Sequence, residues 1–348
     1  MIWLTWRQFR GGAVMMAAAL AVLATILAVT GPGLADDYSA GIAACTAQGT
    51  CLDFVQGFLS DHLLSHLAVT AVVLVLPALV GIFWGAPLIA RELEAGTHRL
   101  VWNQSITRTR WLAVKLGLTG LAAMIATGLG SLAVTWWSSP IDKTAVQFPR
   151  MAPLLFASRG IAPIGYAAFA FALGVTVGML VRRIVPAMAI TLTIFVVAQI
   201  AMPLLVRPHL MAPTRSSVAI TEANFDEFSW GPDGSVEVRS DAAGPAGAWV
   251  LSSHTVDPSG HAIDHISISS PSGACAAPAL TDPQDKGPAG ERITQCLAEL
   301  ERLGYRQVAT YHAASRFWPF QWLETGIYVA LAFALAGFCF WRLRRPLP

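Results

Sequence analysis

Six long runs of apolar residues constrain this chain more than any other feature. A helix needs about 20 mostly apolar residues to cross the hydrocarbon core of a bilayer, and each run is close to or above that length. With 55% hydrophobic and 13% charged residues, the composition is also far from that of a soluble globular domain. The sequence therefore predicts an all-α polytopic protein with six transmembrane helices in a lipid bilayer. The runs cover residues 12–29, 67–89, 111–137, 161–181, 184–206 and 322–341.

The second run is interrupted by residues that disturb regular helices. Pro77, Gly81, Gly85 and Pro87 all fall inside it. Such residues are tolerated in membrane helices because neighbouring helices can satisfy the backbone groups that they leave free. We expect kinks in this span.

The distribution of Lys and Arg predicts that both termini are cytoplasmic. Cytoplasmic loops of membrane proteins retain positive charge, and residues 31–66, on the opposite side under this assignment, contain no Lys or Arg. The segment 138–160 departs from the rule, because it contains Lys143, Arg150 and Arg159. The flanks assigned to the cytoplasm hold Arg7, Arg10, Arg182, Arg183, Arg342, Arg344, Arg345 and the basic residues between 91 and 115.

Two alternatives concern the N-terminus. A cleavable signal peptide would have a shorter apolar region than residues 12–29, and its removal would leave an odd number of spans, so we favour a permanent first span. The preceding stretch "IWLTWRQF" places aromatic residues at helical spacing beside Arg7 and Arg10. It is typical of a short helix lying in the membrane interface, and an ordinary aromatic anchor explains it nearly as well.

One soluble insert, residues 207–320, interrupts the membrane pattern and is predicted to be extracytoplasmic. The stretches "SVEVRS" and "HAIDHISISS" alternate like strands, whereas "AGERITQCLAELERLG" places Ile293, Cys296, Leu297 and Leu300 on one helical face. We therefore expect a small mixed domain between the fifth and sixth spans. The predicted organisation is an interfacial helix with five spans (1–206), this domain (207–320), and the last span with a cytoplasmic tail (321–348).

Four of the five cysteines face an oxidising compartment under this topology. They allow three pairings, of which we favour Cys45 with Cys51 and Cys275 with Cys296, because each pair lies within one loop. Neither pair has a histidine at metal-ligand spacing, so we predict no metal site there. "HAIDH" could be half of a metal site, but polar surface residues explain it at least as well.

Several functional classes lack the residues that they need. There is no phosphate-binding GxxxxGK[ST], no HExxH and no GxSxG, so we nominate no catalytic residue and no cofactor for this chain. The net charge of +2 is spread along the chain, which disfavours nucleic-acid binding. The six runs have no acidic or basic residue near their centres, which disfavours an ion-coupled carrier. Energy for any transport must then come from another protein.

The polar segment 90–111, between the second and third runs, carries a family resemblance. It resembles the cytoplasmic coupling segment of ATP-binding-cassette (ABC) exporter permeases of the type-2 family, in which an acidic pair and Gly-Thr precede a basic residue and a Lys that enters the next helix. The chain is also similar to permeases of high-GC Gram-positive bacteria, in stretches such as "WGAPLIARELEAGTHRL" and "SRFWPFQW". It departs from the family pattern in having "SITR" where a proline usually precedes the basic residue. The residues assigned to coupling are Arg91, Glu92, Glu94, Gly96, Thr97, Arg99 and Arg108, with Lys115 as the lysine.

The resemblance implies a permease subunit without an ATPase of its own. Separate cytoplasmic ABC ATP-binding subunits would bind ATP and Mg²⁺ and dock on the coupling segment, and a second permease, identical or a sister chain, would complete the pathway. Spans lined by small, aromatic and Met residues suggest export of an amphipathic or apolar substrate. Two alternatives stay open: a solvated loop whose charges only set topology, and a membrane-anchored sensor or assembly factor acting through its extracytoplasmic domain.

Overall fold

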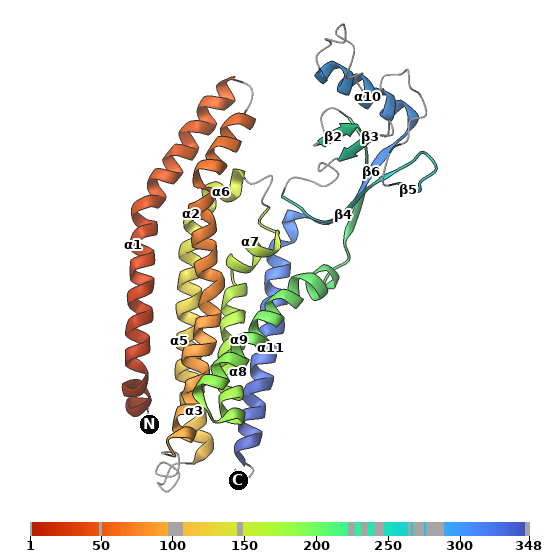
Figure 1. Ribbon diagram of the computed structural model, residues 1–348. Helices are drawn as coiled ribbons and strands as arrows, with labels where there is room; N and C mark the ends of the chain where they lie inside the picture. The colour runs from red at the N-terminus through yellow and green to blue at the C-terminus, as the bar shows by residue number, and fades with distance from the viewer. Residues whose placement is uncertain are drawn as a thin grey trace. The chain divides into compact units, whose positions relative to one another are not determined.

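The computed structural model describes residues 2–48, 51–96, 107–144, 149–221, 227–230, 236–239, 247–263, 266, 275 and 289–344. The chain divides into two compact units (Figure 1). The first is the helical unit, Met1–Leu210 with Phe317–Pro348, and the second is the insert, Met211–Arg316. The insert is therefore slightly shorter than the predicted domain 207–320.

The helical unit confirms the predicted fold class. Within the described residues, six helical segments are long and apolar enough to cross a membrane, and they contain the six predicted runs apart from small differences at the ends. Figure 1 shows the long helices side by side. The elements are α1 (Ile2–Gln48), α2 (Leu52–Leu79), η1 (Val80–Gly85), α3 (Ala86–Glu94), α5 (Arg108–Trp137), α6 (Ser139–Thr144), α7 (Pro153–Ser158), α8 (Ala162–Val181), α9 (Ile184–Ala201), η2 (Met202–Val206), η3 (Arg207–His209) and α11 (Phe317–Arg344).

Helix α8 lies at the centre of this unit. It contacts α2, η1, α3, α5, α9 and α11, and 78% of its most apolar stretch is buried, against 17% in α9 and 6% in α1. Gly174 and Gly178, four residues apart, lie against the backbone of η1 and α3. Small residues at this spacing let helix backbones approach closely within a membrane. The sequence "GVTVG" thus fixes where α8 meets η1 and α3.

The irregular second span contains a π-helical segment. Pro77 lies near the end of α2, and η1 follows as a π-helix that includes Gly81 and Gly85. A proline removes one backbone donor from the helical ladder, which allows the wider turn. A second π-helix, η2, follows α9 at Pro203. The expected disturbance of the second span is therefore present as π turns.

The N-terminus differs from the expected separate interfacial helix. Residues 2–48 form one continuous helix, roughly 70 Å long at 1.5 Å per residue, so it extends well beyond a bilayer core of about 30 Å. Phe9 packs edge-on against Trp84, with ring centroids 4.5 Å apart, whereas Trp3 and Trp6 are exposed. The aromatic stretch is thus the first part of α1, which continues without interruption through Gly11 and Gly12.

The segment 31–66 is a helical hairpin, although we expected a loop. The C-terminal part of α1 and the N-terminal part of α2 contact through Tyr38 and Phe58, with ring centroids 5.8 Å apart. Gly41 leaves room for the Phe54 ring. The Cys45–Cys51 disulfide, with Cα atoms 5.0 Å apart, closes the hairpin as predicted. In Figure 1 these two helices continue past α6.

The insert is a small mixed domain, as predicted. An antiparallel sheet has the strand order β1-β6-β4-β5, and β2 pairs with β3 as a hairpin. Helix α10 (Ala289–Leu303) buries the predicted face, and Cys296, Leu297 and Leu300 form a core with Ile220 and Ile266. The strands are β1 (Thr214–Ala219), β2 (Glu227–Trp230), β3 (Val236–Arg239), β4 (Trp249–Val256), β5 (Ala262–Ile263) and β6 (Arg306–His312), and η5 (Ala314–Arg316) ends the insert.

The second disulfide joins Cys275 to Cys296, with Cα atoms 4.6 Å apart, so both favoured pairings are present. Near the stretch "HAIDH", Asp257 accepts hydrogen bonds from the Ser259 hydroxyl and from the backbone amide of His261. These hydrogen bonds lower the pKa of the Asp257 carboxyl, the Ser259 contact contributing most. Asp257 therefore stabilises a local turn. Residues 264 and 265 of the same stretch lie outside the described residues.

Candidate coupling site

Helix α3 carries three of the predicted coupling residues at the end of the second span. Arg91, Glu92 and Glu94 lie on it, and the helix ends at Glu94. Gly96 follows with φ of +68°, a left-handed conformation that glycine adopts without steric cost. The chain therefore leaves the direction of α3 at Gly96. Thr97 and Arg99 lie outside the described residues, and Arg108 is the exposed first residue of α5.

Glu92 forms an ion pair with Lys115 of α5. The two side chains are 12% and 4% exposed, so the pair is largely removed from water. The Lys115 ammonium also lies 4.9 Å from the centre of the Trp111 ring, within cation–π range. Lys115, the lysine at the beginning of the third span, is thus the partner of Glu92, the first acidic residue of the segment 90–111. This pair joins α3 to α5.

Glu94 contacts a different span. Its Oε2 accepts a hydrogen bond from the backbone amide of Ile184, the first residue of α9, at 3.0 Å. The first amides of a helix have no partner within the helix, and its N-terminus attracts negative charge. Arg182 and Arg183 alone separate α8 from α9, and Arg182 has φ of 58°. Glu94 therefore caps α9 at the tight turn between two spans.

These contacts change the expectation for the acidic pair. We expected Glu92 and Glu94 to face a partner protein, whereas both carboxylates have partners within the chain. Their role in docking stays a prediction. Of the described coupling residues, Arg91, Glu94, Gly96 and Arg108 are exposed, and Arg91 also lines a small pocket with Phe9 of α1 and Trp84 of η1. Arg91 is therefore the clearest candidate for direct contact.

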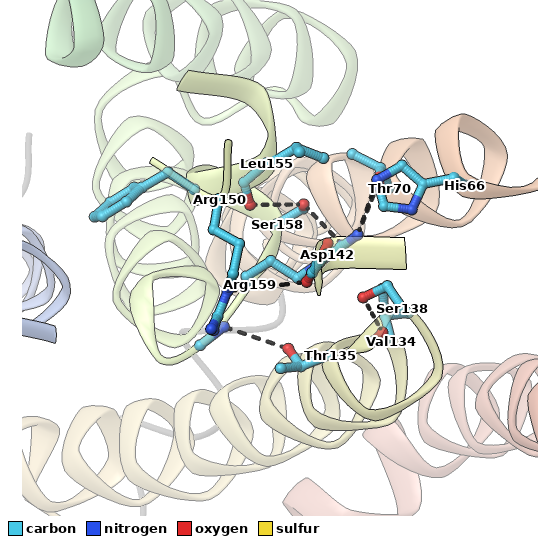
Figure 2. A network of polar contacts seen from close by, with 12 residues as sticks. His66, Thr70, Val134, Thr135, Ser138, Asp142, Arg150, Leu155, Ser158 and Arg159 are labelled. Atoms are coloured by element: carbon cyan, nitrogen blue, oxygen red, sulfur yellow. Dashed lines mark hydrogen bonds and ion pairs between the residues drawn. The ribbon is translucent and has the colours of Figure 1, made fainter. Parts of the chain in front are cut away.

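A buried polar cluster surrounds Arg159, between the third and fourth spans (Figure 2). The guanidinium is fully buried, and its Nε lies 3.4 Å from Oδ2 of Asp142 on α6. It also donates to Ser158, at 3.1 Å, and to Thr70 of α2, at 3.4 Å. Burial lowers the pKa of the Arg159 guanidinium, and the Asp142 carboxylate opposes this effect. The cluster fastens α6 and α7 to α2.

His66 of α2 also contacts the Arg159 guanidinium in this cluster, as a hydrogen-bond acceptor. His66 Nε2 lies 3.5 Å from Nη2 of Arg159. Because a guanidinium can only donate hydrogen bonds, this nitrogen must be the acceptor and His66 must be neutral. In the sequence, Arg159 stands out only as an exception to the predicted distribution of positive charge. Its burial could not be recognised, because its partners come from three separate segments.

A further buried ion pair joins the ends of the fifth and sixth spans. Arg207 donates from Nε to Oε2 of Glu324 at 2.8 Å and from Nη2 to Oε1 at 2.9 Å. The side chains are 1% and 0% exposed. The Tyr166 hydroxyl of α8 donates to the same carboxylate at 2.5 Å. The predicted absence of charge near the span centres therefore does not extend to the span ends. In the sequence, the indication of this ion pair is Glu324, the single Glu inside the run 322–341.

Gln321, one turn before Glu324, holds the beginning of α8. Its Oε1 accepts from the amides of Ile161 and Ala162, at 3.0 and 2.7 Å, and its amide nitrogen donates to the carbonyl of Phe156. Through Gln321 and Glu324, helix α11 thus contacts the N-terminus of α8 and Arg207, which follows the C-terminus of α9. Glu94 contacts the other end of α9, its N-terminus.

Two apolar grooves lie between the membrane helices. One, of about 520 Å³, is formed by α2, η1, α7 and α9, and Arg207 lies at its edge. The other, of about 350 Å³, lies between α5, α8 and α11, and Ala and Gly make up much of its lining. The lining of both grooves is almost entirely apolar, so they suit the hydrocarbon part of a ligand or of a lipid.

The chain was compared with models of known protein families. The model of the family described as "ABC-2 membrane transporter related" matches residues 17–207, which is more than half of the chain. The match contains most of the first span, the next four spans, α3 and its two carboxylate contacts, and the cluster around Arg159. No curated protein and no solved structure matches the chain.

Proposed function

Because the chain belongs to the ABC-2 membrane transporter-related family, we propose that it is the permease subunit of an ATP-driven ABC exporter. The proposal includes separate ATP-binding subunits that hold ATP and Mg²⁺, and a second permease that is an identical copy or a sister chain. The observation that carries it is the placement of α3. This short helix follows the second span, presents Arg91 to solvent, and is joined to α5 and α9 by Glu92 and Glu94. A partner that moves α3 would therefore act on three spans.

The groove between α2 and α9 supports an amphipathic or apolar substrate. Its lining includes Leu79, Phe195 and Ile200, with Gln199 and Arg207 as its polar members. A molecule with a long apolar part could bury that part here, and a polar end could remain near Arg207. Transport in the outward direction is part of the proposal and follows the resemblance to exporters.

Charge reversal at Arg91 should weaken docking of the ATP-binding subunit. We expect Arg91→Glu to reduce the affinity of that subunit about tenfold, because an exposed charge at an interface affects association more than folding. The measurement is binding of the purified ATP-binding subunit to the permease in lipid nanodiscs. Arg215→Glu, the same change on an exposed residue of β1, is the matched control and should leave binding unchanged. If no ATP-binding subunit associates with the unmodified chain, the exporter proposal fails and a sensor or assembly role is favoured.

The proposed orientation places α3 in the cytoplasm and the insert outside. Single cysteines at Thr97 and Ser259 should therefore react oppositely with a membrane-impermeant maleimide in intact cells, with labelling only at position 259. Replacing Cys339 by serine removes the free thiol among the described residues and leaves both disulfides intact. Labelling at both positions after the cells are opened shows that each site is accessible. Labelling of position 97 in intact cells would contradict the orientation.

A further inference from the structure

The Glu94 carboxylate faces the first amide of α9, 90 residues further along the chain. We propose that Glu94 is a positioning residue that joins α3 to α9, so that movement of α3 pulls the fifth span. The inference rests on the proposed function, and it gives Glu94 a role inside the permease in place of contact with the ATP-binding subunit.

Helices α8 and α9, which both lie next to α3, differ in how tightly they are packed. Helix α8 is packed against α3 in direct backbone contact, because a Cβ at Gly178 would overlap the Ala86 carbonyl oxygen. Helix α9 is far less buried than α8. A single directional contact at its N-terminus therefore has more influence on its position than it would have in a tightly packed helix.

The other end of the fifth span is also fixed by a carboxylate. Helix α9 continues through η2 to Arg207, which is bound in bidentate geometry to Glu324 of α11. Between these two ends, Leu192, Val196 and Ile200 face the apolar groove shared with α2. A pull at Glu94 would tilt α9 about the Arg207 end and change the width of that groove.

The chemistry of the contact separates this role from docking. Capping requires an acceptor oxygen for the Ile184 amide, and glutamine supplies one on a side chain of the same length. Docking on a cationic groove requires the negative charge, which glutamine lacks. Glu94→Gln and Glu94→Ala should therefore differ if Glu94 acts on α9, and should agree if it acts through charge on a partner.

Hydrogen–deuterium exchange of the full chain in nanodiscs tests the contact without any partner. In Glu94→Ala, the amide of Ile184 should exchange about tenfold faster, the size expected when a helix-capping hydrogen bond is lost. Glu94→Gln should stay within about threefold of the unmodified chain, because its acceptor remains. Asp61→Ala, which removes an exposed carboxylate of α2, is the control and should change nothing near Ile184. Unchanged exchange in Glu94→Ala would overturn the proposal.

Electron-paramagnetic-resonance distances test the transfer of motion. Spin labels at Met15 of α1 and Ile190 of α9, both exposed, are placed in the Cys339→Ser background. On trapping with ATP and vanadate in the complex, the distance should shift in the unmodified chain and in Glu94→Gln. Glu94→Ala should bind the ATP-binding subunit and hydrolyse ATP but lose the shift. If both variants lose binding of that subunit, Glu94 contacts it directly and the inference fails while the proposed function stands. If the unmodified chain binds no such subunit, the proposed function and the transfer of motion both fail, whatever the exchange experiment shows about the cap.

Discussion

Glu324→Ala is expected to lower the free energy of unfolding of the helical unit by about 3 to 5 kcal/mol, the usual effect of removing one partner from a buried ion pair. The reason is the state of the partner that remains. Arg207 is 1% exposed and directs two nitrogens at the carboxylate, so without Glu324 a guanidinium charge stays buried without its counter-ion. The Tyr166 hydroxyl also loses its acceptor. The measurement is unfolding of the full chain in mixed micelles, followed by tryptophan fluorescence.

Two controls separate burial from charge in this prediction. Glu299 makes a similar bidentate contact with Arg302 on the exposed surface of α10, at 2.6 and 2.7 Å, and Glu299→Ala should change the stability little because solvent screens such pairs. The double variant Arg207→Met with Glu324→Leu removes both charges of this pair and should recover much of the loss. A stability of Glu324→Ala within about 1 kcal/mol of the unmodified chain would show that the carboxylate does not compensate Arg207.

The spans and disulfides could be predicted because their signals are local in the sequence. A run of about 20 apolar residues identifies a span without knowledge of its neighbours. The cysteine pairs are separated by 6 and 21 residues, so each could be assigned within one segment. The buried face of α10 followed from the 3.6-residue period of Ile293, Cys296, Leu297 and Leu300.

The hairpin of α1 and α2 could not be predicted for the opposite reason. Residues 31–66 contain Gly, Pro, Asp and Ser, which are typical of loops, yet those that the structure describes are helical apart from Cys51. Packing decides the outcome here, because Phe54 fits against Gly41 and Tyr38 contacts Phe58. Tertiary contacts of this kind override local preference, and they depend on the register between two helices.

The candidate site was located by sequence, but its contacts were not. The charge of the segment around Glu92 and Glu94, between two apolar runs, predicts the location of the site, and Lys115 belongs to the same pattern. The ion pair between Glu92 and Lys115, and the contact of Glu94 with Ile184, arise only when α5 and α9 pack beside α3. Arg207 and Glu324 are 117 residues apart, so no local pattern joins them.

The second large effect is expected at the contact of α8 with η1. Gly174→Ala should lower the free energy of unfolding by about 3 kcal/mol, because an added methyl group has no space there. A Cβ at this position would overlap the Gly81 carbonyl oxygen and lie 2.7 Å from the Ala86 nitrogen. Both neighbours are backbone atoms, which cannot move aside as a flexible side chain can. The helices must therefore separate, and α3 would lose its fixed position on α8.

Gly337→Ala on α11 is the matched control for Gly174→Ala, because its Cβ would meet no atom within 4 Å. It should be neutral or stabilising, since alanine is favoured over glycine within helices by about 0.5 to 1 kcal/mol. The same unfolding titration measures both variants, and proteolysis near residue 96 reports whether α3 is released. If Gly174→Ala behaves like Gly337→Ala in both measurements, α8 and η1 are not in backbone contact. The rigid connection from α3 to the central helix would then be absent, and transfer of motion to the bundle would depend on the Glu92 and Glu94 contacts alone.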